Sequence, residues 1–140
     1  MGYDSTTIVA EIDKGIKRHD ADNFISTKRN GKWIQTGKNE FKEKVRNLAL
    51  GLYELGVRRG DRVSIHSENS AEWVICDQAI LSLGAANVPI YPTQPGEQIK
   101  YILENSGAKV HIVSNDELFA ETKSLMKSIE NVNAVITLFG

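Results

Sequence analysis

The order of apolar and polar positions predicts a short helix and a hairpin at the start of the chain. Between residues 6 and 19, isoleucine and valine recur at spacings of three and four, the period of an amphipathic helix, with Ser5 or Thr6 as its cap. Two β-prone runs then flank Asn30-Gly31, the dipeptide that a tight hairpin turn selects because both residues tolerate positive φ. We therefore expect an N-terminal helix followed by a β-hairpin.

The strongest helical pattern covers residues 40–55, where apolar residues alternate at spacings of four and three and Gly56 follows as a left-handed cap. An almost wholly apolar helix is predicted over residues 70–83, with Asn69 and Glu72 as its capping box, and such a helix is covered on several sides. The remaining predicted elements are strands over 62–66, 85–91, 109–113 and 132–138, and helices that begin near Pro95 and Asp116.

From residue 62 onward the predicted order is β-α-β-α-β-α-β. Strict alternation of this kind predicts an α/β fold with a mainly parallel sheet and helices on its faces, although it leaves the strand order open. Ligands of open parallel sheets bind beyond the carboxyl ends of the strands. Those ends are His66-Ser67-Glu68, Pro92-Thr93-Gln94 and Ser114-Asn115-Asp116.

Composition is that of one folded domain. The chain has 140 residues, of which 41% are hydrophobic and 25% charged, and its net charge of -1 provides no overall field that would attract nucleic acid or an anionic membrane. No apolar run is long enough to cross a membrane and no signal sequence is present, so a soluble cytoplasmic protein is expected, with attachment at a membrane periphery left open. Gly2 matches the loose pattern for myristoylation.

The strand ends carry two partial matches to known chemical motifs. The junction after Ile65 has Ser67 and Glu68 where a phosphate-binding loop requires glycines, so nucleotide binding by such a loop is not supported. His66-Ser67-Glu68 matches half of the zinc deaminase signature, whose other half needs two cysteines, and the chain has only Cys76, expected to be a buried inert thiol.

The other notable side chains have structural explanations. His19 and His111 lack further ligands at metal spacing, Trp73 is expected in the core, and Tyr91 is expected at the rim of the sheet. The residues therefore predict a fold, and no catalytic, cofactor-binding or metal-binding residue is assigned.

Longer segments, taken in order, carry a family resemblance. These are Gly37-Lys38-Asn39-Glu40-Phe41, Leu55-Gly56-Val57-Arg58-Arg59-Gly60-Asp61-Arg62-Val63, Ser67-Glu68-Asn69-Ser70-Ala71-Glu72-Trp73, Gly84-Ala85-Ala86-Asn87-Val88-Pro89-Ile90-Tyr91-Pro92-Thr93 and Tyr101-Ile102-Leu103-Glu104-Asn105-Ser106-Gly107-Ala108-Lys109. Together they resemble the start of the adenylate-forming acyl-CoA synthetases. Tyr91-Pro92-Thr93 with Glu97-Gln98 is similar to the long-chain fatty acid branch. One departure is Gly37, which stands where the family usually has a capping Ser or Thr before Glu40.

The resemblance implies a parent enzyme that activates a fatty acid with Mg-ATP to an acyl-adenylate and then transfers the acyl group to CoA. The family's phosphate loop, Tyr-Gly-x-Thr-Glu stretch, ribose-binding Gly-Asp and C-terminal lysine do not occur in residues 1–140. The chain is thus expected to be the first, incomplete part of the large N-terminal domain, without an internal boundary and inactive alone. Its expected partner is the remainder of its own chain.

Other interpretations stay open at this point. The chain could be a free-standing α/β binding or interaction module that uses the scaffold without chemistry, or the parent could act on an acetyl, aryl or amino acid group. An incomplete domain also exposes apolar surface that the rest would cover, so self-association is expected.

Overall fold

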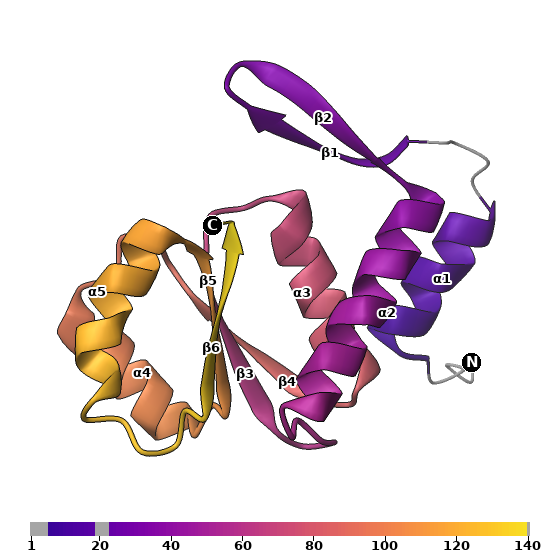
Figure 1. The fold of residues 1–140 in the computed structure, drawn as a ribbon. Helices are drawn as coiled ribbons and strands as arrows, with labels where there is room; N and C mark the ends of the chain where they lie inside the picture. Colours follow the sequence, from indigo (N-terminus) through magenta and orange to yellow (C-terminus); the bar gives the residue numbers. More distant parts are fainter. Residues whose placement is uncertain (1–5, 19–22, 140) are drawn as a thin grey trace, which may run out of the picture.

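The structure is a computed structural model that describes residues 6–18 and 23–139. The elements follow the predicted order along the chain (Figure 1). They are α1 (Ile8–Arg18), β1 (Asn23–Arg29), β2 (Lys32–Gly37), α2 (Lys38–Glu54), β3 (Arg62–His66), α3 (Ala71–Ser82), β4 (Ala86–Ile90), α4 (Gly96–Ser106), β5 (Val110–Asn115), α5 (Asp116–Met126) and β6 (Ala134–Phe139).

The central sheet has four strands in the order β4-β3-β5-β6, and every neighbouring pair is parallel. The parallel direction of these strands confirms the predicted parallel α/β sheet. The structure also supplies the strand order that the sequence left open. The β1–β2 hairpin forms a separate antiparallel pair. Asn30 and Gly31 at its turn have φ of 48° and 77°. These positive values confirm the tight hairpin turn that the Asn-Gly dipeptide predicts.

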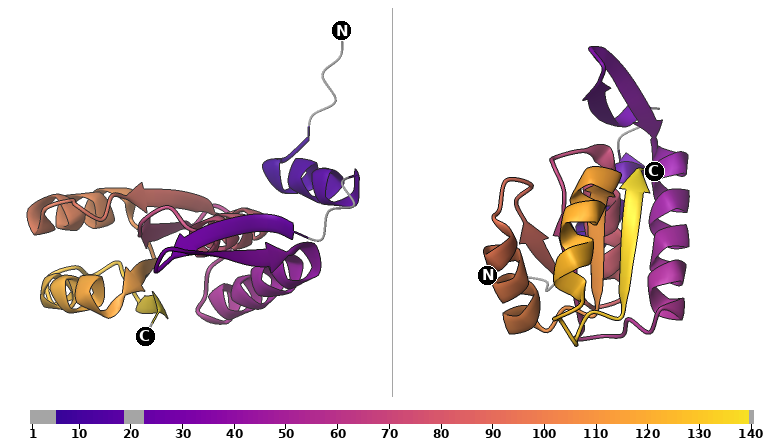
Figure 2. Two further views of the ribbon diagram at one scale, coloured as in Figure 1. Left: turned by 90° about the horizontal axis from the view of Figure 1, so that it is seen from above. Right: turned by 60° about the vertical axis from the view of Figure 1, so that its left-hand side comes forward.

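Helices cover both faces of the sheet (Figure 2). On one face, α2 and α3 pack against alternate residues of the central strands, and the shared core includes Leu52, Ile80, Val63, Ile65 and Ile112. On the other face, α4 and α5 enclose a second apolar cluster. Its buried members are Ile90, Ile99, Leu103, Ala108 and Ile129. The apolar helix α3 is buried on several sides, as its composition predicted.

Helix ends differ from the prediction at two caps. Ser70, not Asn69, caps α3, since its side chain accepts a hydrogen bond from the backbone N–H of Trp73. Glu72 does not complete a capping box, because its carboxylate pairs with Arg29 of the hairpin at 2.6 Å. Thr7 caps α1, where its hydroxyl accepts from the N–H of Ala10 at 3.1 Å. Serine at the true N-cap position satisfies the orphan donor as well as Asn would, so the one-residue shift costs nothing.

Other predicted details are confirmed or lie outside the described residues. Gly37 precedes α2 without a side-chain cap, as its departure from the family pattern implied. Tyr91 stands at the rim of the sheet, 78% exposed, and Trp73 packs against the core. Ser5, Gly2 and His19 lie outside the described residues.

Candidate functional site

The carboxyl ends of β4, β3 and β5 lie beside one another, because these three strands are neighbours in the sheet. The three strand ends at which the sequence predicts ligand binding are therefore adjacent. They are residues 66–68 after β3, 92–94 beyond β4 and 114–116 at the end of β5. Parallel sheets place their ligands at this edge. We call this group of junctions the carboxyl edge.

Two histidines lie buried beside each other on neighbouring strands of the sheet. The rings of His66 on β3 and His111 on β5 are stacked at 5.9 Å between centroids, with an angle of 30° between their planes, and both side chains are completely buried. Nδ1 of His111 lies 2.7 Å from the hydroxyl of Ser64. Neither nitrogen of His66, nor Nε2 of His111, has a hydrogen-bond partner among the described residues.

Burial determines the charge of this pair. It lowers the pKa of His111 to about 3, with a smaller contribution from the neighbouring His66. Burial also lowers the pKa of His66, although the backbone of Pro92 and the carboxylates of Glu121 and Glu68 oppose the shift. Both imidazoles are therefore neutral at neutral pH, and the carboxyl edge offers no histidine cation to an anionic ligand.

Helix N-termini at the carboxyl edge are already occupied by protein side chains. Ser70 caps α3, and the next free N–H, that of Ala71, donates to the hydroxyl of Thr27 in the hairpin at 2.8 Å. Asn115 caps α5 by accepting from the N–H of Leu118. Since a helix binds phosphate through such orphan N–H groups, these caps compete with that use.

The described part of the chain also holds no cluster of metal ligands and no activated cysteine. No group of three or more His, Cys, Asp or Glu side chains there is arranged to hold a metal ion. Cys76 is buried in α3, and burial raises the pKa of its thiol to about 12, so the thiolate nucleophile is disfavoured.

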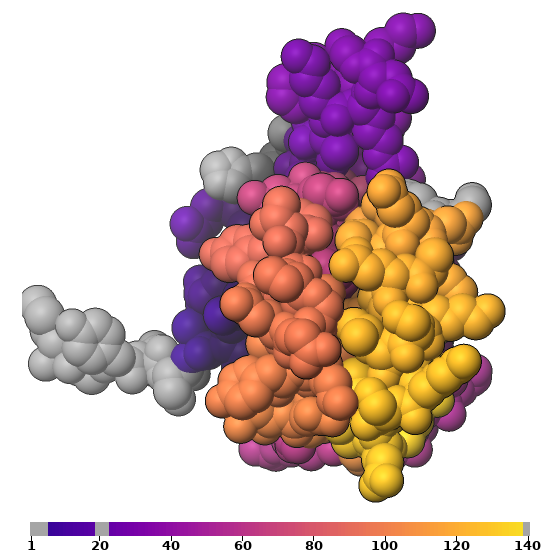
Figure 3. Space-filling view, turned by 90° about the vertical axis from the view of Figure 1, so that its left-hand side faces the viewer, coloured from indigo at the N-terminus to yellow at the C-terminus, as the bar shows by residue number. Residues whose placement is uncertain are grey.

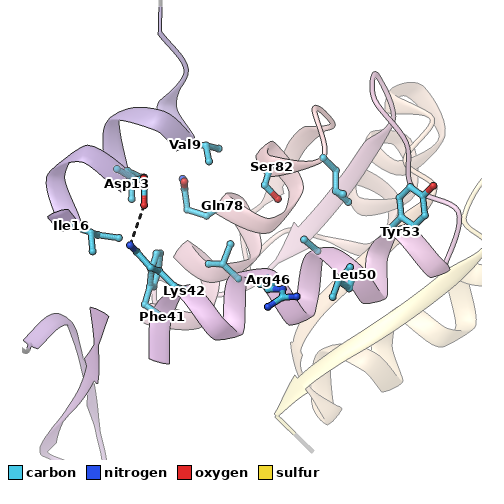
Figure 4. A pocket seen from close by; sticks show the side chains of 14 residues that line it. Val9, Asp13, Ile16, Phe41, Lys42, Arg46, Leu50, Tyr53, Gln78 and Ser82 are labelled. Atoms are coloured by element: carbon cyan, nitrogen blue, oxygen red, sulfur yellow. Dashed lines mark ion pairs between the residues drawn. The ribbon is translucent and has the colours of Figure 1, made fainter. Parts of the chain in front are cut away.

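An apolar groove of about 560 Å³ lies elsewhere, between α1, α2 and α3 (Figure 4). We call it the apolar groove, and its apolar lining is Val9, Ile12, Ile16, Phe41, Val45, Ala49, Leu50, Tyr53 and Leu83. An ion pair between Asp13 and Lys42, at 3.1 Å, joins α1 to α2 at its margin. The periodicity of residues 40–55 predicts one apolar stripe on α2, and Leu50 and Tyr53 form a second, exposed flank outside that stripe.

Comparisons with known proteins agree with the fold. The sequence profile of the family described as "AMP-binding enzyme" matches residues 17–139. The long-chain-fatty-acid–CoA ligase FadD15 of Mycobacterium bovis is 38% identical over 110 residues, which are 79% of this chain and 18% of that ligase. The crystal structure of a long-chain-fatty-acid-CoA ligase (FadD1) from Archaeoglobus fulgidus superposes with a TM-score of 0.81 at 23% identity, covering 98% of this chain and 28% of that one.

These findings define the class first: an α/β domain with the fold found in the N-terminal portions of adenylate-forming enzymes. The chain belongs to the AMP-binding enzyme family, and long-chain fatty acid–CoA ligases are among its relatives. It spans 18% of the length of its M. bovis relative. An uncharacterized protein of Mycobacterium tuberculosis is 41% identical over 73 residues, which make up 42% of that protein, so that relative is itself short.

Proposed function

We propose that residues 1–140 are the first part of the large N-terminal domain of an ATP-dependent long-chain fatty acid–CoA ligase. In the proposed reaction, the fatty acid carboxylate attacks the α-phosphate of ATP and releases pyrophosphate. The CoA thiol then displaces AMP from the acyl-adenylate to give the thioester. The observation that carries the proposal is the 38% identity to the M. bovis ligase over most of this chain.

Within this reaction the chain supplies scaffold. ATP, Mg and CoA are the substrates and cofactor of the proposed parent, and no group of three or more His, Cys, Asp or Glu side chains among the described residues is arranged to hold a metal ion. The neutral, buried His66 and His111 and the capped starts of α3 and α5 support the same interpretation. We therefore assign no reaction step to a residue of this chain.

Its principal proposed partner is the remainder of the parent polypeptide. Two surfaces are suited to that contact. One is the apolar groove, and the other is the outer edge of β6, which pairs with β5 on its inner side and with no strand of the described sheet on its outer side. When these surfaces are uncovered, the chain is expected to associate with itself. Of the described residues, none belongs to a helix with the length and hydropathy needed to span a bilayer.

A second candidate is a free-standing α/β binding or interaction module. The short M. tuberculosis relative favours it, because a similar segment there accounts for a large part of a short chain. The two candidates differ in one property: a scaffold segment becomes catalytically productive when the rest of a ligase is joined to it, and a free-standing module does not.

The test is a chimeric enzyme. Residues 1–140 would replace the matching segment of the M. bovis ligase, and thioester formation from ATP, Mg, palmitate and CoA would be measured. We expect no turnover by the 140-residue chain alone and turnover by the chimera. The same ligase with its matching segment deleted is the control, and it should be inactive.

Two results would contradict the proposal. Turnover by the purified 140-residue chain would show that the reaction does not need the missing motifs. A chimera that is folded by circular dichroism and monodisperse by gel filtration, yet inactive, would favour the free-standing module instead.

A further inference from the structure

The β1–β2 hairpin stands out from the body of the protein, over the start of α3 (Figure 1). In the space-filling view it forms a separate projection (Figure 3). Its inner face is held in place: Thr27 accepts from the N–H of Ala71, and Arg29 pairs with Glu72. At its base the ring of Phe24 lies 4.7 Å from that of Phe41. The hairpin is therefore presented in a defined orientation rather than as a loose loop.

The strand register separates the two faces of the hairpin. Lys28 is paired with Trp33 across the strands, and Ser26 with Gln35, so these four share the face opposite to Thr27 and Arg29. Trp33 is 67% exposed, far more than a tryptophan in a core, and the ammonium group of Lys28 lies 6.0 Å from the centre of its ring. The outer face thus combines a large exposed aromatic ring with a cation.

Charge on the hairpin has one sign. Residues 23–37 contain Lys28, Arg29 and Lys32 and no acidic residue, whereas the whole chain has a net charge of -1. Arg29 is neutralised by Glu72, but Lys28 and Lys32 form no ion pair with a carboxylate in the part of the chain that the structure describes. The net charge that argued against an anionic partner is therefore an average that conceals a local basic surface.

We propose that this hairpin docks the protein on the surface of an anionic phospholipid bilayer. Tryptophan is the side chain that settles at the headgroup level, because its ring is apolar and its N–H is polar. Neighbouring lysines are attracted by anionic headgroups. Ile34, 49% exposed, pairs with Thr27 and lies on the opposite face, so Trp33 is the large apolar side chain of the outer face. The inference does not depend on the proposed ligase function.

A bilayer fits this surface better than single-stranded nucleic acid does. Proteins that bind single strands stack successive bases on several aromatic side chains along a basic groove. Here Trp33 is the one large aromatic at the tip, and the surface around it is a projection, not a groove. A projection can meet a flat lipid surface without any rearrangement of the body.

Tryptophan emission measures the proposed contact directly. In a Trp73→Phe background Trp33 is the sole tryptophan, and its emission should shift to shorter wavelength when vesicles of equal parts phosphatidylcholine and phosphatidylglycerol are added. Vesicles of phosphatidylcholine alone should give little shift, and high salt should weaken binding to the anionic vesicles. Brominated lipid should quench the emission, since bromine acts only at contact distance.

Substitutions then locate the contact by vesicle co-sedimentation. Lys28→Gln and Lys32→Gln should each lower partitioning roughly fivefold, and Trp33→Ala roughly tenfold. Controls are Lys123→Gln on α5, Lys127→Gln in the turn after α5 and Tyr101→Ala on α4, which remove exposed lysines and an exposed aromatic ring away from the hairpin and should have little effect. Circular dichroism checks that each variant is folded.

The proposal is overturned if the anionic vesicles leave the Trp33 emission unchanged, or if the hairpin variants partition like the wild-type chain. It is equally overturned if the protein binds a single-stranded oligonucleotide or poly-glutamate through Lys28 and Lys32 while ignoring the vesicles. In that case the basic hairpin recognises a different polyanion.

Discussion

The hydroxyl of Ser64 lies 2.7 Å from Nδ1 of His111, and both side chains are completely buried. Ser64→Ala would leave that ring nitrogen without its partner in the interior. The loss of a buried hydrogen bond with one partner left unsatisfied costs about 1–3 kcal/mol. We expect the free energy of unfolding in urea to fall by that amount. Ser82→Ala, at a more exposed site bonded to the carbonyl of Ala79, is the control and should change it by less than half as much.

The buried histidines make stability depend on pH in a specific direction. His66 and His111 have pKa values below the ordinary 6.5, so the folded state binds fewer protons than the unfolded state. The stabilisation is complete above about pH 6.5 and is lost as the pH falls from there toward about 3, by a few kcal/mol in all. Urea unfolding at a series of pH values from 7 down to about 4.5 measures this slope before most carboxylates titrate.

A variant isolates the histidines in that experiment. His66→Gln combined with His111→Gln removes both titrating groups, so its stability should be nearly flat over the same pH range, whatever its absolute stability. A slope as steep as that of the wild-type chain would show that other groups cause the acid sensitivity. Cys76, with a pKa of about 12, does not titrate in this range.

Hydrophobic periodicity predicted the helices and strands well, because each of them is specified mainly by residues that are close together in the sequence. The alternation of strands and helices after residue 62 was enough for a parallel α/β fold, and Asn30-Gly31 was enough for a hairpin. Strand order was not predictable, since β3 pairs with both β4 and β5 through contacts that depend on how helices pack across the sheet. The error at the cap of α3 has a similar origin: Asn69 and Ser70 are both good caps, and the fold selects between them.

Surface features were the least predictable from the sequence. The apolar groove combines side chains of α1, α2 and α3, which are far apart in the chain. Likewise, the basic character of the hairpin is hidden in an average charge of -1, because Glu72 pairs with Arg29 whereas Lys28 and Lys32 pair with no carboxylate among the described residues. The stacking of His66 on His111 required the register of β3 against β5. Each of these depends on tertiary contacts that no local pattern specifies.

Two glycines should respond oppositely to the same substitution. Gly107 ends α4 with φ of +63°, and an added Cβ would lie 2.7 Å from the Arg62 guanidinium, so Gly107→Ala should lower the unfolding free energy by about 1 kcal/mol or more. Gly51 lies inside α2 with open space around it, so Gly51→Ala should raise the unfolding free energy by about 0.5–1 kcal/mol. Thermal unfolding measures both shifts. Equal effects at the two sites would contradict the assigned backbone roles.

The two edges of the sheet differ in how they are protected. Edge strand β4 contains Pro89, which removes a backbone donor, whereas β6 consists of uncharged residues without proline and has one described neighbour, β5. Uncharged, regular edges invite pairing with another strand, and a charge placed on such an edge opposes it. We therefore expect the self-association of this chain to proceed through β6.

A lysine placed on each edge tests that expectation. Thr137→Lys on β6 should shift the chain toward monomer in sedimentation velocity measured over a range of concentrations, because pairing would bury the new charge. Ala86→Lys, at an exposed position of β4, is the matched control and should leave the association constant unchanged. A wild-type chain that stays monomeric at every concentration would contradict self-association itself. Equal weakening by both lysines would place the contact elsewhere, with the apolar groove as the next surface to examine.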